Sequence, residues 1–320
     1  MSSLQHAKHR TTPDAGSATG TRGDFVAVLD HLGVLHFSGE DAETFLQGQV
    51  SCDVARVDLR SSSYGAYCTP KGRMLANFLL WRDAEGFSMA LSRDIASAVQ
   101  KQLSRYVLRS KVKVSDASGM VVLVGAAGQQ GERAFAGMFP ELPVRPNEVR
   151  SVPGVGTVIR LKDGRLFLAL RTSIDSRVEL VDARVWRRLD IRGGLPLITA
   201  ATQDQFVPQM ANLELIGGVS FEKGCYTGQE VVARAQHLGN VKRRMFLANV
   251  PIPAQAGDAL YSDDLGEQAA GTVLNVEASP DGGYDLLAVV QAASRERATV
   301  HLGAPGGAIL RFLPLPYAVA

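Results

Sequence analysis

The segment KGCYTGQE, residues 223–230, contains the residue type best suited to chemistry in this chain, a cysteine two positions after a lysine. Thr227 and Glu230 form a T-x-x-E pattern, which predicts a capping box at the start of a helix. Unpaired backbone N–H groups and the positive end of the helix dipole favour an anion there. The spacing therefore predicts that Cys225 lies just before a helix, where its thiolate form is favoured.

Two alternatives remain open for this cysteine from the residues alone. A free cysteine is often a small buried apolar residue, and neighbouring glycines can serve only a tight turn. Hydrolytic chemistry would need a histidine base nearby in space, but His237 lies three helical turns further on and no other histidine spacing indicates a base. No metal site is predicted, because C-x-x-C pairs are absent among Cys52, Cys68 and Cys225.

The elements that must hold this segment follow a mixed α/β pattern from Asp24 onwards. Alternating or continuous apolar runs predict strands, and apolar residues at helical spacing predict helices. We expect a short strand over 217–221 and a helix that begins after the cysteine. The other expected strands are 25–29, 34–37, 64–69, 74–81, 87–91, 111–115, 121–124, 157–161 and 166–170, and the expected helices are 40–49, 94–109, 132–138 and 182–191.

The pattern changes after Arg244, where short strands alternate with Pro, Gly and Asp turns. This pattern predicts a separate small β-barrel over 245–320. Residues 1–23 are rich in Ser, Thr, Gly and Ala and predict a disordered tail without the apolar core of a signal peptide. The expected barrel strands are 245–250, 257–261, 271–276, 284–290, 299–302 and 309–313.

Composition limits the class of protein. The 320 residues are 46% hydrophobic, which suits two or three domains at about 100–200 residues each. Lys and Arg number 34 against 32 Asp and Glu, so no basic field predicts direct nucleic-acid binding. The longest apolar run, 120–127, is far shorter than the roughly 18 residues that cross a membrane. Three scattered cysteines are typical of a reducing cytoplasm.

Four stretches in order along the chain resemble the YgfZ family. They are FLQGQ (45–49), PKGRM (70–74), PQMANL (208–213) and KGCYTGQE (223–230), which continues to Ala233 and Arg234. This family is related to the glycine-cleavage T-protein. The resemblance implies an α+β fold, a T-protein-like ring of three domains. Two interleaved α/β domains would occupy 24–244 as the folate-binding region, and the barrel would be the third.

The resemblance also implies a function. YgfZ proteins are tetrahydrofolate-binding accessory proteins that support assembly or maintenance of iron–sulfur enzymes, including those that thiomethylate tRNA. The implied functional thiol is Cys225, with Lys223 beside it. The alternatives are a folate-dependent aminomethyltransferase or other one-carbon transferase, and a thiol enzyme whose base lies elsewhere in the fold. The sequence leaves open whether the chain is an enzyme.

The implied folate site includes Trp186, which otherwise fits a core position on an amphipathic helix. Arg234 belongs to a basic cluster that suits either the folate glutamate tail or a solvated helix end. Three positions depart from the family pattern. Leu32 replaces a tryptophan, Arg192 replaces a pterin-binding glutamate, and Asn77 ends a stretch that lacks the transferase carboxylates. An amide cannot act as a general base, so this last departure favours the accessory protein.

Overall fold

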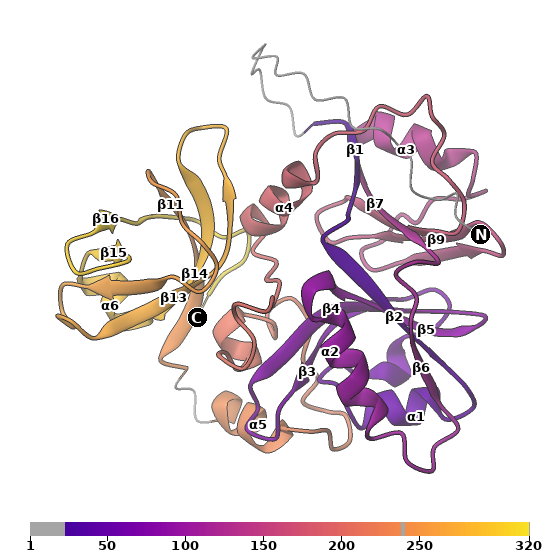
Figure 1. The fold of residues 1–320 in the computed structure, drawn as a ribbon, viewed down its shortest axis with the longest axis horizontal. Helices are drawn as coiled ribbons and strands as arrows, with labels where there is room; N and C mark the ends of the chain where they lie inside the picture. The colour runs from indigo at the N-terminus through magenta and orange to yellow at the C-terminus, as the bar shows by residue number, and fades with distance from the viewer. Residues whose placement is uncertain (1–22, 238–240, 320) are drawn as a thin grey trace.

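The structure is a computed structural model that describes residues 23–237 and 241–319. It contains three β-sheets, two with five strands and one with seven (Figure 1). The predicted tail lies outside the described residues except for Gly23. Within the described ranges, no helix has both the length and the apolar character needed to cross a membrane.

The first sheet is antiparallel and is built from two separate parts of the chain. Its first strand comes from the start of the described chain, and its other strands follow only after the second sheet is complete. Two helices accompany it, α3 (Gly128–Ala136) and α4 (Ala183–Arg192). The strand order is β1 (Phe25–Val28), β7 (Val122–Ala127), β10 (Leu166–Leu170), β9 (Gly156–Arg160) and β8 (Val149–Val152).

The second sheet fills the interval between β1 and β7. Helices α1 (Ala42–Gln47) and α2 (Arg93–Ser104) pack with it, and α2 buries one apolar face that includes Ile95, Val99 and Leu103. The chain therefore passes from the first sheet to the second and back. The strand order is β3 (Ser63–Cys68), β4 (Met74–Asp83), β5 (Gly86–Ser92), β2 (Leu32–Ser38) and β6 (Lys113–Asp116).

The third sheet is the nearly closed C-terminal barrel that the turn pattern predicts, and it stands apart from the other two in Figure 1. It also carries a short helix, α6 (Ala292–Arg297), which the sequence pattern did not indicate. The strand order is β16 (Ala308–Ile309), β15 (Val300–Leu302), β12 (Ala259–Ser262), β13 (Ala269–Ala278), β14 (Tyr284–Gln291), β11 (Arg243–Val250) and β17 (Arg311–Leu313).

Three predicted elements differ from the structure. Residues 217–221 run from a turn through irregular backbone to a bend rather than forming a strand. Gly217 has φ +84°, and the one backbone–backbone hydrogen bond to the neighbouring segment runs from the Ser220 N–H to the Ser51 carbonyl, at 2.9 Å. Helix α2 ends at Ser104, five residues before the predicted end. Helix α3 begins four residues before the predicted start, and strand β8 lies in a segment for which no element was predicted.

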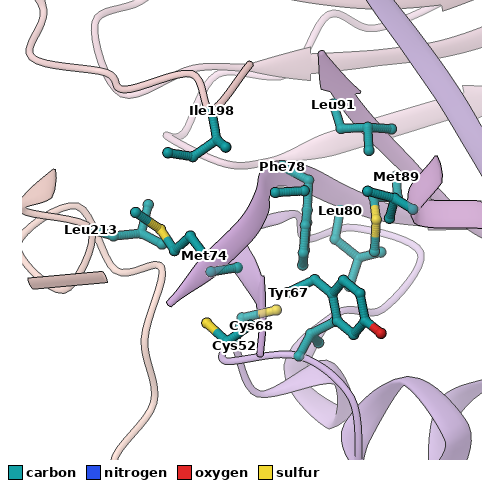
Figure 2. Packing of buried hydrophobic residues seen from close by; sticks show 14 of the residues in the cluster. Cys52, Tyr67, Cys68, Met74, Phe78, Leu80, Met89, Leu91, Ile198 and Leu213 are labelled. Atoms are coloured by element: carbon teal, nitrogen blue, oxygen red, sulfur yellow. The ribbon is translucent and has the colours of Figure 1, made fainter. Parts of the chain in front are cut away.

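The largest apolar core joins the second sheet to the segments that follow α4 and to the barrel. Figure 2 shows Cys52 and Cys68 inside this core, beside Tyr67, Met74 and Phe78. Met245 and Leu247 of β11 belong to the same cluster. The segment 205–232 is therefore held between the second sheet and the barrel.

Candidate functional site

Only one of the three cysteines is accessible. All three are free, and Cys225 is exposed while Cys52 and Cys68 are buried. Burial raises the pKa of Cys52 and of Cys68 to about 12, so both remain thiols at neutral pH. Gly224 before the exposed cysteine is exposed too, and a side chain there would meet no atom within 4 Å. Cys225 is therefore presented outward on an open stretch of loop.

Lys223 fixes the loop two residues before the thiol. Its Nζ donates hydrogen bonds to the carbonyls of Gln47 at 2.7 Å, Val50 at 2.7 Å and Cys52 at 2.8 Å. The Gln47 carbonyl belongs to the last residue of α1, where carbonyl groups lack partners within the helix and favour a cation, and the other two carbonyls follow it in the chain. Burial lowers the pKa of Lys223 to about 8, which leaves it mainly protonated at pH 7. All three N–H donors are engaged, so the lysine anchors KGCYTGQE to FLQGQ.

Two glycines join the same loop to the PKGRM turn. Gly72 has φ +71° and Gly228 has φ +84°, a region that disfavours other residues. A Cβ on Gly228 would lie 2.4 Å from the Thr69 carbonyl oxygen and 3.0 Å from the Gly72 Cα. A Cβ on Gly72 would lie 2.9 Å from the Val231 Cβ. The backbone at Gly228 therefore packs directly against the backbone of the PKGRM turn, and a side chain on Gly228 would force the two apart.

The PQMANL motif, residues 208–213, holds the helix that follows the cysteine. Helix α5 (Gln229–His237) is supported by η2 (Pro208–Ala211), because Gln209 Nε2 donates to the Val232 carbonyl at 2.6 Å. Asn212, with φ +55°, donates to the Met245 carbonyl at 2.8 Å and so ties the motif to β11. All four sequence motifs therefore meet around one loop, although they are far apart in the chain.

The start of α5 differs from the predicted capping box. The Tyr226 N–H donates to Gln229 Oε1 at 3.2 Å, a return bond one position earlier than expected. Glu230 instead pairs with Arg234 at 2.8 Å across one helical turn. Among the side chains that the structure describes, which exclude that of His237, none is hydrogen-bonded to the Cys225 thiol. The structure therefore shows Cys225 as a free, exposed thiol, and its chemical role stays a prediction.

Trp186 lies on α4 and is buried, with 2% of its surface exposed. The Arg165 guanidinium lies 4.0 Å from its ring centre, and the edge of Phe25 packs against it. The indole also lines a cavity of about 70 Å³ together with Leu32, Tyr64 and other residues. Trp186 is therefore both a core residue and a residue that lines a cavity.

Asp190 is a pocket residue that sequence reasoning missed. It lies one helical turn after Trp186, on the same face of α4, and lines the same cavity. Its carboxylate accepts a hydrogen bond from Arg165 at 2.6 Å, and burial raises its pKa to about 6. The i, i+4 spacing from the tryptophan was the signal that could have identified it.

Two of the family departures have structural explanations. Arg192 points to the barrel, where it pairs with the fully buried Asp285 at 2.6 Å and with Asp281 at 2.8 Å. Asn77 lines the Trp186 cavity but both ends of its amide are engaged: it donates to the Pro196 carbonyl at 2.6 Å and accepts from the Ile198 N–H at 2.7 Å. Asn77 is therefore a structural residue that holds the segment after α4.

The predicted site residues do not form one site. Cys225 and Lys223 lie together at the four-motif loop, whereas Trp186 lies at the cavity beside α4. Arg234 is on α5, which Figure 1 shows at a different place from α4, and it does not line the Trp186 cavity. Its role toward a ligand stays a prediction.

Known proteins resemble this chain over most of its length. The "tRNA-modifying protein YgfZ" of Shigella boydii is 33% identical over 305 residues, which cover 91% of this chain and 92% of that protein. The protein of the same name from Sodalis glossinidius is 31% identical over 304 residues, with the same coverage. No protein-family model matches the chain.

A solved structure shares the fold. The glycine cleavage system aminomethyltransferase T from Bartonella henselae matches with a TM-score of 0.74, over 92% of this chain and 86% of that one, at 19% sequence identity. The likeness confirms the T-protein-like α+β fold that the motifs indicated.

Proposed function

Because the chain belongs to the YgfZ family, we propose that it is a cytoplasmic, tetrahydrofolate-binding accessory protein for iron–sulfur enzymes that thiomethylate tRNA. Cys225 is its functional thiol, and Lys223 positions the loop that carries it. The convergence of four distant motifs on one exposed cysteine is the observation that carries the proposal. Such a rigid, outward-facing thiol suits action on a partner protein rather than on a substrate enclosed in a pocket.

The cavity beside α4 has the chemistry that a pterin requires. Trp186 and Tyr64 supply aromatic walls, and the Asp190 carboxylate supplies an acceptor for ring N–H groups. Asp190 would accept the pterin hydrogen bonds that Arg192, which stands in place of the family glutamate, cannot accept. The cavity volume of about 70 Å³ is below the roughly 300–1,000 Å³ of typical small-molecule sites, so ligand binding must widen it.

Folate binding has a direct test in a titration that follows tryptophan fluorescence. Tetrahydrofolate should quench the emission, and Asp190→Asn should weaken binding about tenfold, the effect of losing one charge-assisted hydrogen bond. Arg234→Gln is the corresponding variant for Arg234, the other residue that is predicted to contact folate. Equal affinity in wild type and Asp190→Asn would remove Asp190 from the ligand site.

A transferase role is disfavoured by Asn77, whose amide is engaged at both ends. We therefore expect no aminomethyl transfer to tetrahydrofolate from a charged lipoyl carrier protein. Turnover on the order of 1 per second would be typical of an enzyme and would contradict the accessory role.

The accessory function is tested in a bacterial strain that lacks its own YgfZ-family protein. Expression of this chain should restore thiomethylated nucleosides in tRNA, measured by mass spectrometry. A well-expressed chain that leaves thiomethylation at the level of the empty vector would overturn the proposal.

A further inference from the structure

A second cavity lies where the first two sheets meet, and it takes no part in the proposed function. We propose that it binds a small zwitterion with an apolar body, the class that includes amino acids with aliphatic or aromatic side chains. Its volume is about 320 Å³, within the range of small-molecule sites. At roughly 30 Å³ per water molecule, this space equals about ten waters.

The wall of this cavity is apolar and comes from both sheets. Leu29 follows β1, Leu123 belongs to β7 and Leu170 ends β10, and all three are buried. Leu32 of β2 completes the wall and also lines the Trp186 cavity. This wall fits a hydrocarbon body rather than a polar one such as a sugar.

The polar side chains at the cavity leave two charges available. Arg171 is neutralised by Glu85, to which it donates at 2.6 and 2.7 Å. Ser118 Oγ already accepts from a backbone N–H, at 2.9 Å. Arg93 and Asp30 are both exposed cavity residues, and neither forms an ion pair with another residue of the described ranges. One free guanidinium and one free carboxylate therefore share the rim.

The fold brings these opposite charges to one place. The Arg93 N–H donates to the His31 carbonyl at 2.9 Å, so Arg93 at the start of α2 lies against the turn that contains Asp30. Arginine suits bidentate contact with a carboxylate, and a carboxylate suits an ammonium group. A ligand with only a negative charge would be repelled by Asp30, and a ligand with only a positive charge would be repelled by Arg93. A ligand that carries both charges satisfies the two residues together.

An unpartnered hydroxyl group is a second sign of a ligand. Thr172 lines the cavity, and its Oγ1 is buried without a hydrogen-bond partner in the described part of the chain. Buried polar atoms are nearly always hydrogen-bonded, so an orphan beside a cavity is informative. The carboxylate or ammonium group of a zwitterion would supply the missing partner by shifting the cavity wall, because the oxygen itself is buried.

Three compounds of the same shape test the charge requirement by isothermal titration calorimetry. L-Phenylalanine carries both charges, 3-phenylpropanoate lacks the ammonium group and 2-phenylethylamine lacks the carboxylate. L-Phenylalanine should bind about tenfold more tightly than either of the others. Equal binding of all three, or no saturable binding of L-phenylalanine at millimolar concentrations, would overturn the proposal.

Variants then locate the binding site. Arg93→Gln should weaken L-phenylalanine about tenfold, and Asp30→Asn should abolish its advantage over 3-phenylpropanoate. Gly119 lines the cavity and has open space at its Cβ position, so Gly119→Phe should place a bulky side chain at the cavity and weaken L-phenylalanine binding. Gly137→Phe is the matched control, since its Cβ position is also open but lies outside the cavity.

Melting curves establish that each variant is folded. Unchanged L-phenylalanine affinity in Arg93→Gln, Asp30→Asn and Gly119→Phe would place any binding elsewhere and contradict the proposal. Gly119→Phe should still bind tetrahydrofolate, so failure here is distinguishable from failure of the folate site.

Discussion

At the residue scale, the chain separates residues that face partners from residues that hold the fold. Cys225 is exposed, whereas Lys223, two positions earlier, donates to three backbone carbonyls. Either residue alone could be read from sequence as chemically active. Burial and hydrogen-bond partners, which the sequence does not display, show that the ammonium group holds the loop and that the thiol is left exposed for its proposed role.

His31 provides a pH-dependent prediction at this scale. Burial, followed by the nearby Arg187, lowers its pKa from 6.5 to about 4. The unfolded chain therefore binds more protons between pH 6.5 and 4, so stability falls as pH falls through this window. His31→Phe should remove about 2 kcal/mol of the loss between pH 7 and 5, measured by urea unfolding. An identical pH dependence in variant and wild type would show that His31 is not buried in its neutral form.

At the element scale, the four-motif loop depends on backbone contact between Gly72 and Gly228. Gly228→Ala should destabilise the protein by on the order of 1–3 kcal/mol, because it adds a Cβ 2.4 Å from a carbonyl oxygen at a positive φ. Gly224→Ala, in the same loop but with open space, should stay within about 0.5 kcal/mol of wild type. Similar unfolding free energies for the two variants would contradict the packing described here.

Much of the element pattern could be predicted from sequence because apolar periodicity is local. The barrel and α5 follow from such patterns, as does most of α2. The strand expected over 217–221 was wrong, since Val219 packs in the core while Phe221 is exposed, and the neighbour of the segment is a single serine rather than a strand. The cap at Gln229 rather than Glu230 reflects a choice between adjacent polar residues that only the loop geometry decides.

The candidate site could be predicted only in part, for a similar reason. The motif residues pointed to Cys225 and the family resemblance pointed to Trp186, and both stay predictions as functional residues. The contacts among the four motifs join residues up to 176 positions apart, which no local spacing indicates. Asp190 was missed because the family pattern directed attention to Arg192, which the helix turns toward the barrel.

At the scale of the whole molecule, α4 links the cavity to the barrel. Trp186 and Asp190 line the cavity, whereas Arg187 and Arg192 pair with Glu277 and Asp285 of the barrel at 2.8 and 2.6 Å. A ligand that widens the cavity beside α4 therefore acts on the helix that holds the barrel. Under the proposed function, this connection would give bound folate a route to influence the barrel.

Arg192→Met tests this link. It should cost about 3 kcal/mol in unfolding free energy, because it leaves the carboxylate of Asp285 buried without its cation. The double variant Arg192→Met/Asp285→Leu should cost less than the single one, since no unpaired charge remains. Additive losses in chemical denaturation would indicate that the two residues are not coupled.

The central claim is that an exposed thiol, held by four motifs, carries the function. Its most direct test is tRNA thiomethylation in the strain that lacks its own YgfZ-family protein, with Cys225→Ala compared with wild type at matched expression. The account predicts loss of thiomethylated nucleosides to the empty-vector level, with a melting temperature close to that of wild type because the side chain is exposed. Cys68→Ala, the buried control, should lower the melting temperature instead. Wild-type thiomethylation by Cys225→Ala would contradict the claim and leave the four-motif loop as a structural element.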